Sequence, residues 1–295
     1  MITDTIPLVA GNGSAQLQKY LLHHSLEFQT DRRRPAVIIC PGGGYLSTSD
    51  REAEPVALRF ASRGYHAFVL RYTTWFGRHV PDPYSEPPGD ARSAFPQPLV
   101  ELAEALLTVR RNAREWRIDP NRIAIIGFSA GGHLAASLGV HWADGLLEEK
   151  LRADDKELLR PDALVLGYSL VDQAHALERE HQAPYKSLVY QAMFGRSDPS
   201  AEELQARSPV RYVNAGTPPT FLWHTADDDL VSARNALLWA SALAEIGIPY
   251  ELHIFESGVH GLSLADETSA AESSHVNAEC QAWFDLALTW LGGRL

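Results

Sequence analysis

The sequence predicts an α/β fold with a mostly parallel central sheet and helices on both of its faces. Strand-like and helix-like segments alternate along the chain, as is typical of parallel sheets. Residues 35–40 and 122–128 are continuous apolar runs, as expected of strands that are buried on both faces. Neither a repeat nor a linker divides the 295 residues, so we treat residues 1–295 as a single domain.

The elements follow in a regular order. The predicted strands lie at 20–28, 35–40, 65–72, 122–128, 162–168, 220–225 and 250–256. The predicted helices lie at 54–64, 98–116, 130–141, 232–246 and 277–291. Right-handed crossovers would place the carboxyl ends of the parallel strands along one edge of the sheet, where ligand and catalytic groups gather.

Two long segments interrupt this order. Residues 73–97 are rich in proline and include Trp75, and residues 169–219 carry four aromatic residues. Long connections in a compact domain are usually functional or disordered. We expect both insertions to be cap elements over the active edge, and the alternative is surface decoration whose aromatic residues pack for stability.

The composition narrows the class of protein. A formal net charge of −11 argues against non-specific binding to nucleic acid or to anionic membranes. With only Cys40 and Cys280, a disulfide framework is not expected, which suits a reducing compartment. Residues 1–14 lack the basic and apolar regions of a secretory signal, and no segment reaches the length of a membrane span. We therefore expect a cytoplasmic protein.

One serine lies where a strand must turn into a helix. Gly127-Phe128-Ser129-Ala130-Gly131 matches G-x-S-x-G, in which glycines avoid collisions across a strained turn that lifts the hydroxyl clear of the sheet. The backbone N–H of Ala130 would lie at the helix N-terminus and could face an oxyanion. The alternative is a glycine-rich turn whose serine only caps the helix.

A serine nucleophile needs a base, which we expect to be His260. This histidine lies in a loop after the last strand, with Gly258 and Gly261 around it, and could swing to the serine at the same sheet edge. The other histidines have simpler interpretations: His133 and His141 lie on the helix after the serine, and His253 lies within a strand. His224 ends a strand just before an acidic cluster.

The base in turn needs an acid, and Asp227, Asp228 and Asp229 follow the strand at 220–225. Adjacent carboxylates repel one another, so we expect only one of them to point inward. We favour Asp228, with Asp227 second. Asp172, which follows the preceding strand, is a third candidate.

A glycine-rich loop, Cys40-Pro41-Gly42-Gly43-Gly44-Tyr45, follows the strand at 35–40. Its glycines allow backbone N–H groups to approach a substrate carbonyl closely. We expect Gly43, Gly44 and Ala130 to form an oxyanion hole. The spacing and the lack of a following lysine argue against a phosphate-binding loop, and the sequence has neither H-E-x-x-H nor C-x-x-C for a metal.

Four segments together resemble the α/β-hydrolase superfamily: PGGGY (41–45), GFSAGGHLA (127–135), HTADDDLV (224–231) and HIFESGVHGLSLA (253–265). The likeness runs from about residue 18 to the C-terminus and is greatest to bacterial cytoplasmic esterases of the acetylxylan-esterase-like and feruloyl-esterase-like (lipase/esterase) branch. It implies an α/β-hydrolase fold with Ser129 as nucleophile, Asp228 as acid, His260 as base, and Gly43, Gly44 and Ala130 as oxyanion donors. The chain differs in having Pro41 where many relatives have histidine, and Ser232 where they often have proline.

Together these features predict a serine carboxylic-ester hydrolase with a Ser-His-Asp triad, an acyl-enzyme and no cofactor or metal. The resemblance suggests short acyl groups, such as acetyl esters on xylo-oligosaccharides, so the expected partner is a small-molecule or oligosaccharide ester. The alternatives are a peptidase, formamidase or lactonase of the same fold, and a non-catalytic binding protein. The sequence leaves the acyl group, the alcohol and the oligomeric state open.

Overall fold

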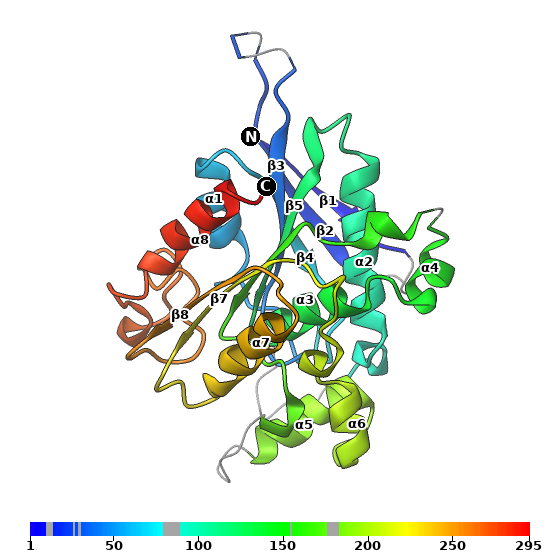
Figure 1. Ribbon diagram of the computed structural model, residues 1–295, viewed down its shortest axis with the longest axis vertical. Helices are drawn as coiled ribbons and strands as arrows, with labels where there is room; N and C mark the ends of the chain where they lie inside the picture. Colours follow the sequence, from blue (N-terminus) through cyan, green and yellow to red (C-terminus); the bar gives the residue numbers. More distant parts are fainter. Residues whose placement is uncertain (10–13, 26, 29–30, 79–88, 154, 176–182) are drawn as a thin grey trace.

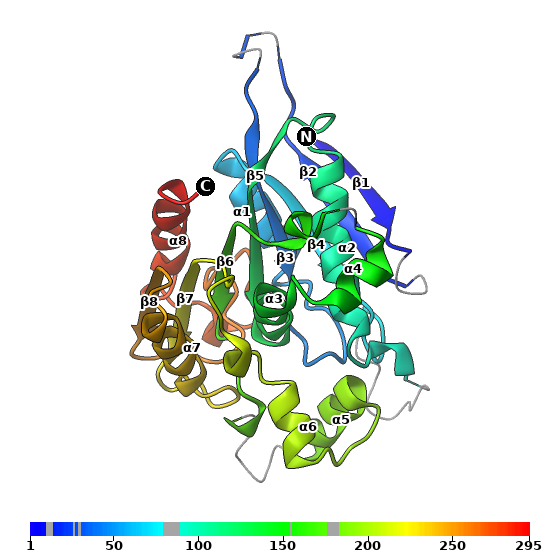
Figure 2. The same cartoon turned by 45° about the vertical axis from the view of Figure 1, so that its right-hand side comes forward.

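The fold is organised around one mostly parallel sheet (Figures 1 and 2). The computed structural model describes residues 1–9, 14–25, 27–28, 31–78, 89–153, 155–175 and 183–295. In these residues the sheet has eight strands in the order β1-β2-β4-β3-β5-β6-β7-β8. The strands are β1 Ile2–Pro7, β2 Gln16–Leu21, β3 Arg34–Cys40, β4 His66–Arg71, β5 Ile118–Phe128, β6 Ala163–Gly167, β7 Thr220–Thr225 and β8 Tyr250–Phe255.

Helices cover both faces of this sheet. They are α1 Glu54–Ser62, α2 Gln97–Arg111, α3 Ser129–His141, α4 Gly145–Leu151, α5 Ala183–Phe194, α6 Ala201–Ala206, α7 Arg234–Glu245 and α8 Ala282–Gly292. Short 3₁₀ helices lie at Ala91–Ser93, Lys156–Leu159, Gln173–His175, Pro209–Tyr212 and Ser273–His275. None of the helices in these residues is both long enough and apolar enough to cross a membrane.

The two faces of the sheet are buried by different helices, which explains the continuous apolar runs of the central strands. On β3, Ile38 belongs to the core that includes α2, α3 and α7. Its neighbours Val37 and Ile39 belong to the core that includes α1 and α8. Because successive side chains of a strand point to opposite faces, a strand covered on both sides needs apolar residues at every position.

The prediction of a strand at 20–28 is wrong, because β2 ends at Leu21. β2 pairs antiparallel with β4, with Gln16 opposite Arg71 and Tyr20 opposite Ala67. Since β4 begins at His66 and β1 begins at Ile2, neither of the described strands beside β2 extends far enough to pair with the chain beyond Leu21. The Leu22 N–H donates to Nδ1 of the His66 side chain instead. The strand β1, which pairs with the outer edge of β2, was not predicted.

The long helix predicted at 98–116 ends at Arg111. The Asn112 side chain donates to the Thr108 carbonyl oxygen at 2.8 Å, and the chain then turns toward Arg117, which has a φ of +56°. A residue in this left-handed region cannot continue a helix. The other predicted strands and helices agree with the structure to within a few residues at most ends, and α8 begins at Ala282.

Both cysteines are buried and free. Cys40 ends β3, and Cys280 lies just before α8. Burial, with smaller contributions from Glu279 and Asp227, raises the pKa of the Cys280 thiol to about 11. Burial also raises the pKa of Cys40.

Candidate active site

Ser129 is the first residue of α3 and follows the last residue of β5 directly. Its φ is +50°, a left-handed conformation that is unusual for a serine. A Cβ atom at Gly127 would lie 2.5 Å from the Gly131 carbonyl oxygen, and one at Gly131 would collide with the Cys40 carbonyl oxygen. The turn is therefore strained and requires both glycines, as the sequence pattern predicts.

The carboxyl ends of β5, β7 and β8 bring three side chains together. The Ser129 hydroxyl lies 2.9 Å from Nε2 of His260, and Nδ1 of His260 lies 2.7 Å from Oδ2 of Asp228. In the tautomer that suits both contacts, Nδ1–H donates to the carboxylate and Nε2 accepts from the hydroxyl. The arrangement allows the imidazole to remove the serine proton.

Asp228 is a buried carboxylate whose charge is well compensated. Its Oδ1 accepts hydrogen bonds from the backbone N–H groups of Leu230 and Val231, both at 2.9 Å. Burial by itself would raise the pKa of Asp228, but hydrogen bonds from His224 and His260 outweigh it and hold the pKa well below its usual range. Asp228 therefore remains ionised and can stabilise a protonated His260.

His224 contributes to the site in a way that the sequence did not reveal. It is completely buried on β7, and its Nε2–H donates to the Val231 carbonyl oxygen at 2.8 Å and lies 3.3 Å from Oδ2 of Asp228. Its Nδ1 has no hydrogen-bond partner in the described structure. The one feature of the sequence that could have indicated a contact between them is that His224 lies four residues before Asp228, near the end of a strand.

The other acidic candidates face elsewhere. Asp227 is exposed, and it accepts hydrogen bonds from the Ser257 hydroxyl at 2.6 Å and the Gly258 N–H at 2.7 Å. Asp172 accepts from the Ser208 hydroxyl at 3.3 Å. Of the three candidates, Asp228 is the one whose carboxylate meets His260.

The glycine loop after β3 lies beside Ser129. Gly43 and Gly44 have φ values of +125° and +63°, which glycine adopts readily. Across the described part of the chain, the backbone N–H groups of Gly43, Gly44 and Ala130 have no protein acceptor. They remain available to an oxyanion. Pro41 is fixed here through its carbonyl oxygen, which accepts from the Tyr72 hydroxyl at 2.7 Å.

A buried glutamate, Glu52, connects the glycine loop to the loop that carries His260. Its Oε2 accepts from the Gly42 N–H at 2.6 Å, which removes Gly42 from the set of oxyanion donors. Its Oε1 accepts from the Tyr168 hydroxyl at 2.7 Å, and that hydroxyl accepts from the Ser263 N–H at 2.9 Å. The Tyr168 ring also packs edge-on against His260, with 5.1 Å between ring centroids.

Arg51 reinforces this connection, because its guanidinium donates to the Gly261 carbonyl oxygen at 2.8 Å. Neither Arg51 nor Glu52 was predicted as a site residue. Their position shortly after the glycine loop carried no signal, because Tyr168, the side-chain partner of Glu52, and Gly261, the partner of Arg51, lie more than a hundred residues away in the sequence.

A small cavity of about 30 Å³ opens beside Ser129. Its wall includes Gly44 and Ala130 as well as three side chains of α5, namely Tyr185, Val189 and Met193. A Cβ atom at Gly44 would collide with the Tyr185 hydroxyl, so the helix lies directly against the glycine loop.

In the described residues, no cluster of three or more His, Cys, Asp or Glu side chains is placed to hold a metal ion.

Comparison with known proteins identifies the family of the chain. The family model described as BD-FAE matches residues 25–243. The chain is 34% identical to endo-1,4-beta-xylanase B of Butyrivibrio fibrisolvens over 80% of its own length and 34% of that protein. The chain spans between a third and a half of the length of the first curated relatives it matches.

Solved structures that are similar to nearly the whole chain include two hydrolases. The acetyl ester-xyloside bifunctional hydrolase of Caldicellulosiruptor lactoaceticus is 35% identical, with a TM-score of 0.72 over 95% of this chain and 88% of that one. The carboxylesterase Cest-2923 of Lactobacillus plantarum is 28% identical, with a TM-score of 0.81 over 99% and 98%. The fold is thus that of the α/β hydrolases, and the chain belongs to the BD-FAE family of that superfamily.

Proposed function

We propose that this protein is a serine carboxylic-ester hydrolase that acts on short-acyl esters, with acetylated xylo-oligosaccharides as the substrate class. The observation that carries the proposal is the hydrogen-bonded series from Asp228 through His260 to Ser129, which ends at a small cavity beside unpaired backbone amides. The family, and relatives named as a carboxylesterase and an acetyl ester-xyloside hydrolase, support the same reaction class.

In the proposed reaction, Ser129 attacks the ester carbonyl while His260 takes its proton. The carbonyl oxygen becomes negative and is stabilised by the N–H groups of Gly43, Gly44 and Ala130. His260 then gives its proton to the departing alcohol, which leaves an acyl-enzyme. Water, activated by His260, attacks the acyl group and restores the serine, while Asp228 keeps the imidazole in the reactive tautomer throughout.

The size of the cavity supports a short acyl group. A volume of about 30 Å³ is close to the smallest space that can hold one or two water-sized groups. The methyl group of an acetyl ester would fit this space, and a longer chain would come against Val189 or Met193 of its wall. The substrate class on the alcohol side rests on the name of the xyloside hydrolase relative.

We further propose that the second insertion, residues 169–219, acts as a cap over the site. Its helix α5 lies beyond the carboxyl ends of the strands, at the lower end of the sheet in Figures 1 and 2, and supplies one wall of the cavity. The first insertion, residues 73–97, would contribute a second cap element. Residues 79–88 and 176–182 of these segments lie outside the described structure.

The reaction is tested by labelling and by substitution of the serine. We expect a fluorophosphonate probe to label the protein once, at Ser129, and Ser129→Ala to lose both labelling and at least about 10⁴-fold of p-nitrophenyl acetate turnover. Circular dichroism of the variant checks that it is folded. Labelling at another residue, or faster cleavage of aminoacyl anilides than of the acetate, would contradict the proposal.

A further inference from the structure

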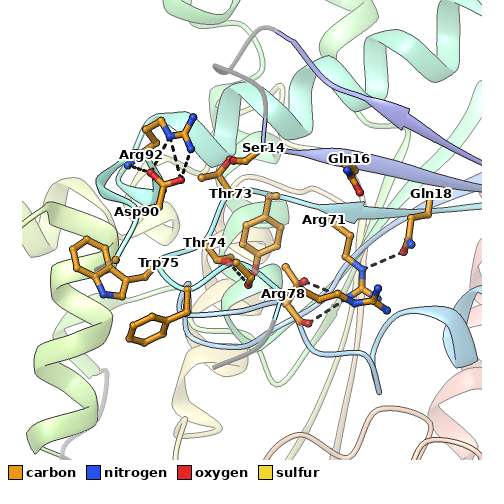
Figure 3. Close-up of a pocket in the computed structure, with 15 residues that line it drawn as sticks. Ser14, Gln16, Gln18, Arg71, Thr73, Thr74, Trp75, Arg78, Asp90 and Arg92 are labelled. Carbon is orange, nitrogen blue, oxygen red and sulfur yellow. Dashed lines mark hydrogen bonds and ion pairs between the residues drawn. The ribbon is translucent and has the colours of Figure 1, made fainter. Parts of the chain in front are cut away.

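A second cleft, much larger than the cavity at Ser129, is lined by residues of β2, of the end of β4 and of the segment after β4 (Figure 3). Its volume is about 570 Å³, within the range of roughly 300–1,000 Å³ that is usual for ligand sites. In Figure 3, Gln16 and Gln18 of β2 lie on one side of the cleft, and Trp75 lies on the other. The cleft contains no part of the Ser129, His260 and Asp228 constellation.

The charges in the cleft are paired. Arg71 and Arg78 both donate to Oδ1 of Asp50, at 2.6 and 3.1 Å, and Arg92 lies 2.7 Å from Oδ2 of Asp90. Because Arg71 and Arg78 share one carboxylate, the three guanidinium groups face two carboxylates, which leaves a single net positive charge. Each guanidinium is held in place by a carboxylate, so its remaining N–H groups are fixed donors that a neutral ligand can use.

The remaining lining has the two surfaces that a carbohydrate requires. Trp75 and Phe76 are half-buried aromatic side chains of this lining, and the Gly89 backbone packs against the Trp75 indole. The exposed parts of the two rings offer an apolar surface to a sugar ring. The Gln16 amide makes no hydrogen bond to any other residue that the structure describes, so both its donor and its acceptor groups can serve a ligand. None of Ser129, His260 and Asp228 is among the described residues that line this cleft, so we assign it to binding rather than to reaction.

The cleft is placed to bind the alcohol part of an ester attacked at Ser129. It lies at the same edge of the sheet as the serine, where β4 ends and the antiparallel β2 begins. The backbone of Trp75 and Phe76 donates to the carbonyl oxygens of Tyr45 and Leu46, both at 2.9 Å, so the cleft adjoins the glycine loop.

The distance from the serine follows from the order of the strands. Ser129 follows β5, which is two strands from β4 and three from β2. With neighbouring strands about 4.8 Å apart, the ends of β4 and β2 that border the cleft lie roughly 10–15 Å from β5 across the sheet. A chain of two or three sugar units can span this separation, whereas a single unit cannot.

We propose that this cleft is a binding subsite for a neutral oligosaccharide, the alcohol part of the ester whose acetyl group enters the small cavity. The inference rests on the proposed esterase function, and it adds the location and minimum length of the sugar chain. It assigns Gln16 and Trp75 to substrate binding, with no part in the chemical step.

The test compares Gln16→Leu with Gln205→Leu. Gln205 is an exposed glutamine on α6 that lines neither cavity, so it provides a matched control. The readout is kcat/KM for acetylated xylotriose divided by kcat/KM for p-nitrophenyl acetate. We expect this ratio to fall about threefold to tenfold in Gln16→Leu through a higher KM, which corresponds to one lost neutral hydrogen bond, and to stay constant in Gln205→Leu. Trp75→Leu should lower the ratio further.

A second arm separates this inference from the esterase proposal. Unacetylated xylotetraose, titrated into Ser129→Ala by calorimetry, should bind, and Gln16→Leu in that background should weaken the binding by a similar factor. If the wild type hydrolyses p-nitrophenyl acetate but Gln16→Leu keeps the ratio and the sugar affinity of its parent, the cleft proposal is wrong. If no ester is hydrolysed but xylotetraose binds in a Gln16-dependent way, the esterase proposal fails and the cleft proposal stands.

Discussion

At the scale of single residues, two adjacent aspartates illustrate how location decides function. The Asp228 carboxylate is buried against His260, whereas the Asp227 carboxylate is exposed and held by Ser257 and Gly258. We expect Asp228→Asn to lower kcat on p-nitrophenyl acetate by about 10⁴-fold, because the amide cannot hold the required imidazole tautomer. Asp227→Asn keeps an acceptor oxygen and should retain most activity. The reverse pattern would overturn the assignment of the acid.

Glu52 permits an equally specific test of positioning. In Glu52→Gln, the new NH₂ group must face either the Gly42 N–H or the Tyr168 hydroxyl, so a buried donor loses its acceptor. At about 1–3 kcal/mol for such a loss, we expect kcat to fall by about five- to 150-fold while KM changes little.

Tyr168→Phe removes the other half of this contact, so the double variant should lose less than the sum of the two single losses. Glu54→Gln, an exposed change two residues away, is the matched control. Fully additive losses would show that Glu52 and Tyr168 act independently.

At the scale of elements, α5 supplies one wall of the small cavity in which we expect the acyl group to bind. Val189 lines the small cavity, and its neighbour Leu188 on the same helix is exposed. We expect Val189→Ala to raise the ratio of p-nitrophenyl butyrate to acetate turnover, measured as kcat/KM, by about tenfold, since one or two methylene groups are worth this much in a pocket. Leu188→Ala should leave the ratio constant. An unaltered ratio in Val189→Ala would mean that the acyl group lies elsewhere.

The elements that the sequence predicted well are those whose own residues form a recognisable apolar pattern. β3 and β5 are buried on both faces and are apolar throughout their cores, so each is recognisable without knowing its neighbours. β1 is almost entirely exposed and is defined by its pairing with β2, which no local pattern reveals. β2 is a similar case: it lies at Gln16–Leu21, whereas the sequence predicted a strand at 20–28, because its local pattern is weak.

The candidate site also shows that residues defined by distant partners cannot be recognised from the local sequence. Ser129, Asp228 and His260 could be proposed from the sequence because each lies just after a strand, within a short pattern of glycines or acids. Glu52 and His224 could not, because a buried polar residue is recognised by its partners. The partner hydroxyl of Glu52, on Tyr168, is 116 residues away.

At the scale of the whole molecule, two buried histidines couple folding to pH. Burial, assisted by the positive charge of Arg34 at one and of Arg207 at the other, lowers the pKa of His66 and of His133 to about 4, from 6.5 in the unfolded chain. Their contribution to stability is therefore complete above pH 6.5 and is lost as the pH falls toward 4. Between these values each can change the free energy of unfolding by about 1.4 kcal/mol per pH unit.

Urea denaturation at pH 5.0 to 6.5 measures this dependence. In the wild type, we expect the free energy of unfolding to rise with pH. In His66→Gln, the slope of this free energy against pH should be smaller by the amount that corresponds to one bound proton. The comparison isolates the histidine from carboxyl groups that titrate nearby. An identical slope in the two proteins would show that His66 is not linked to unfolding.

The burial of both cysteines has a practical consequence. Because neither thiol is exposed and both have a raised pKa, little reactive thiolate forms near neutral pH. A cysteine introduced on the surface, for instance in place of Leu188 on α5, would then be the main target of a maleimide dye. The helix beside the small cavity could thus carry a fluorophore without first removing the native sulfhydryls, and its movement on addition of an ester could be followed directly.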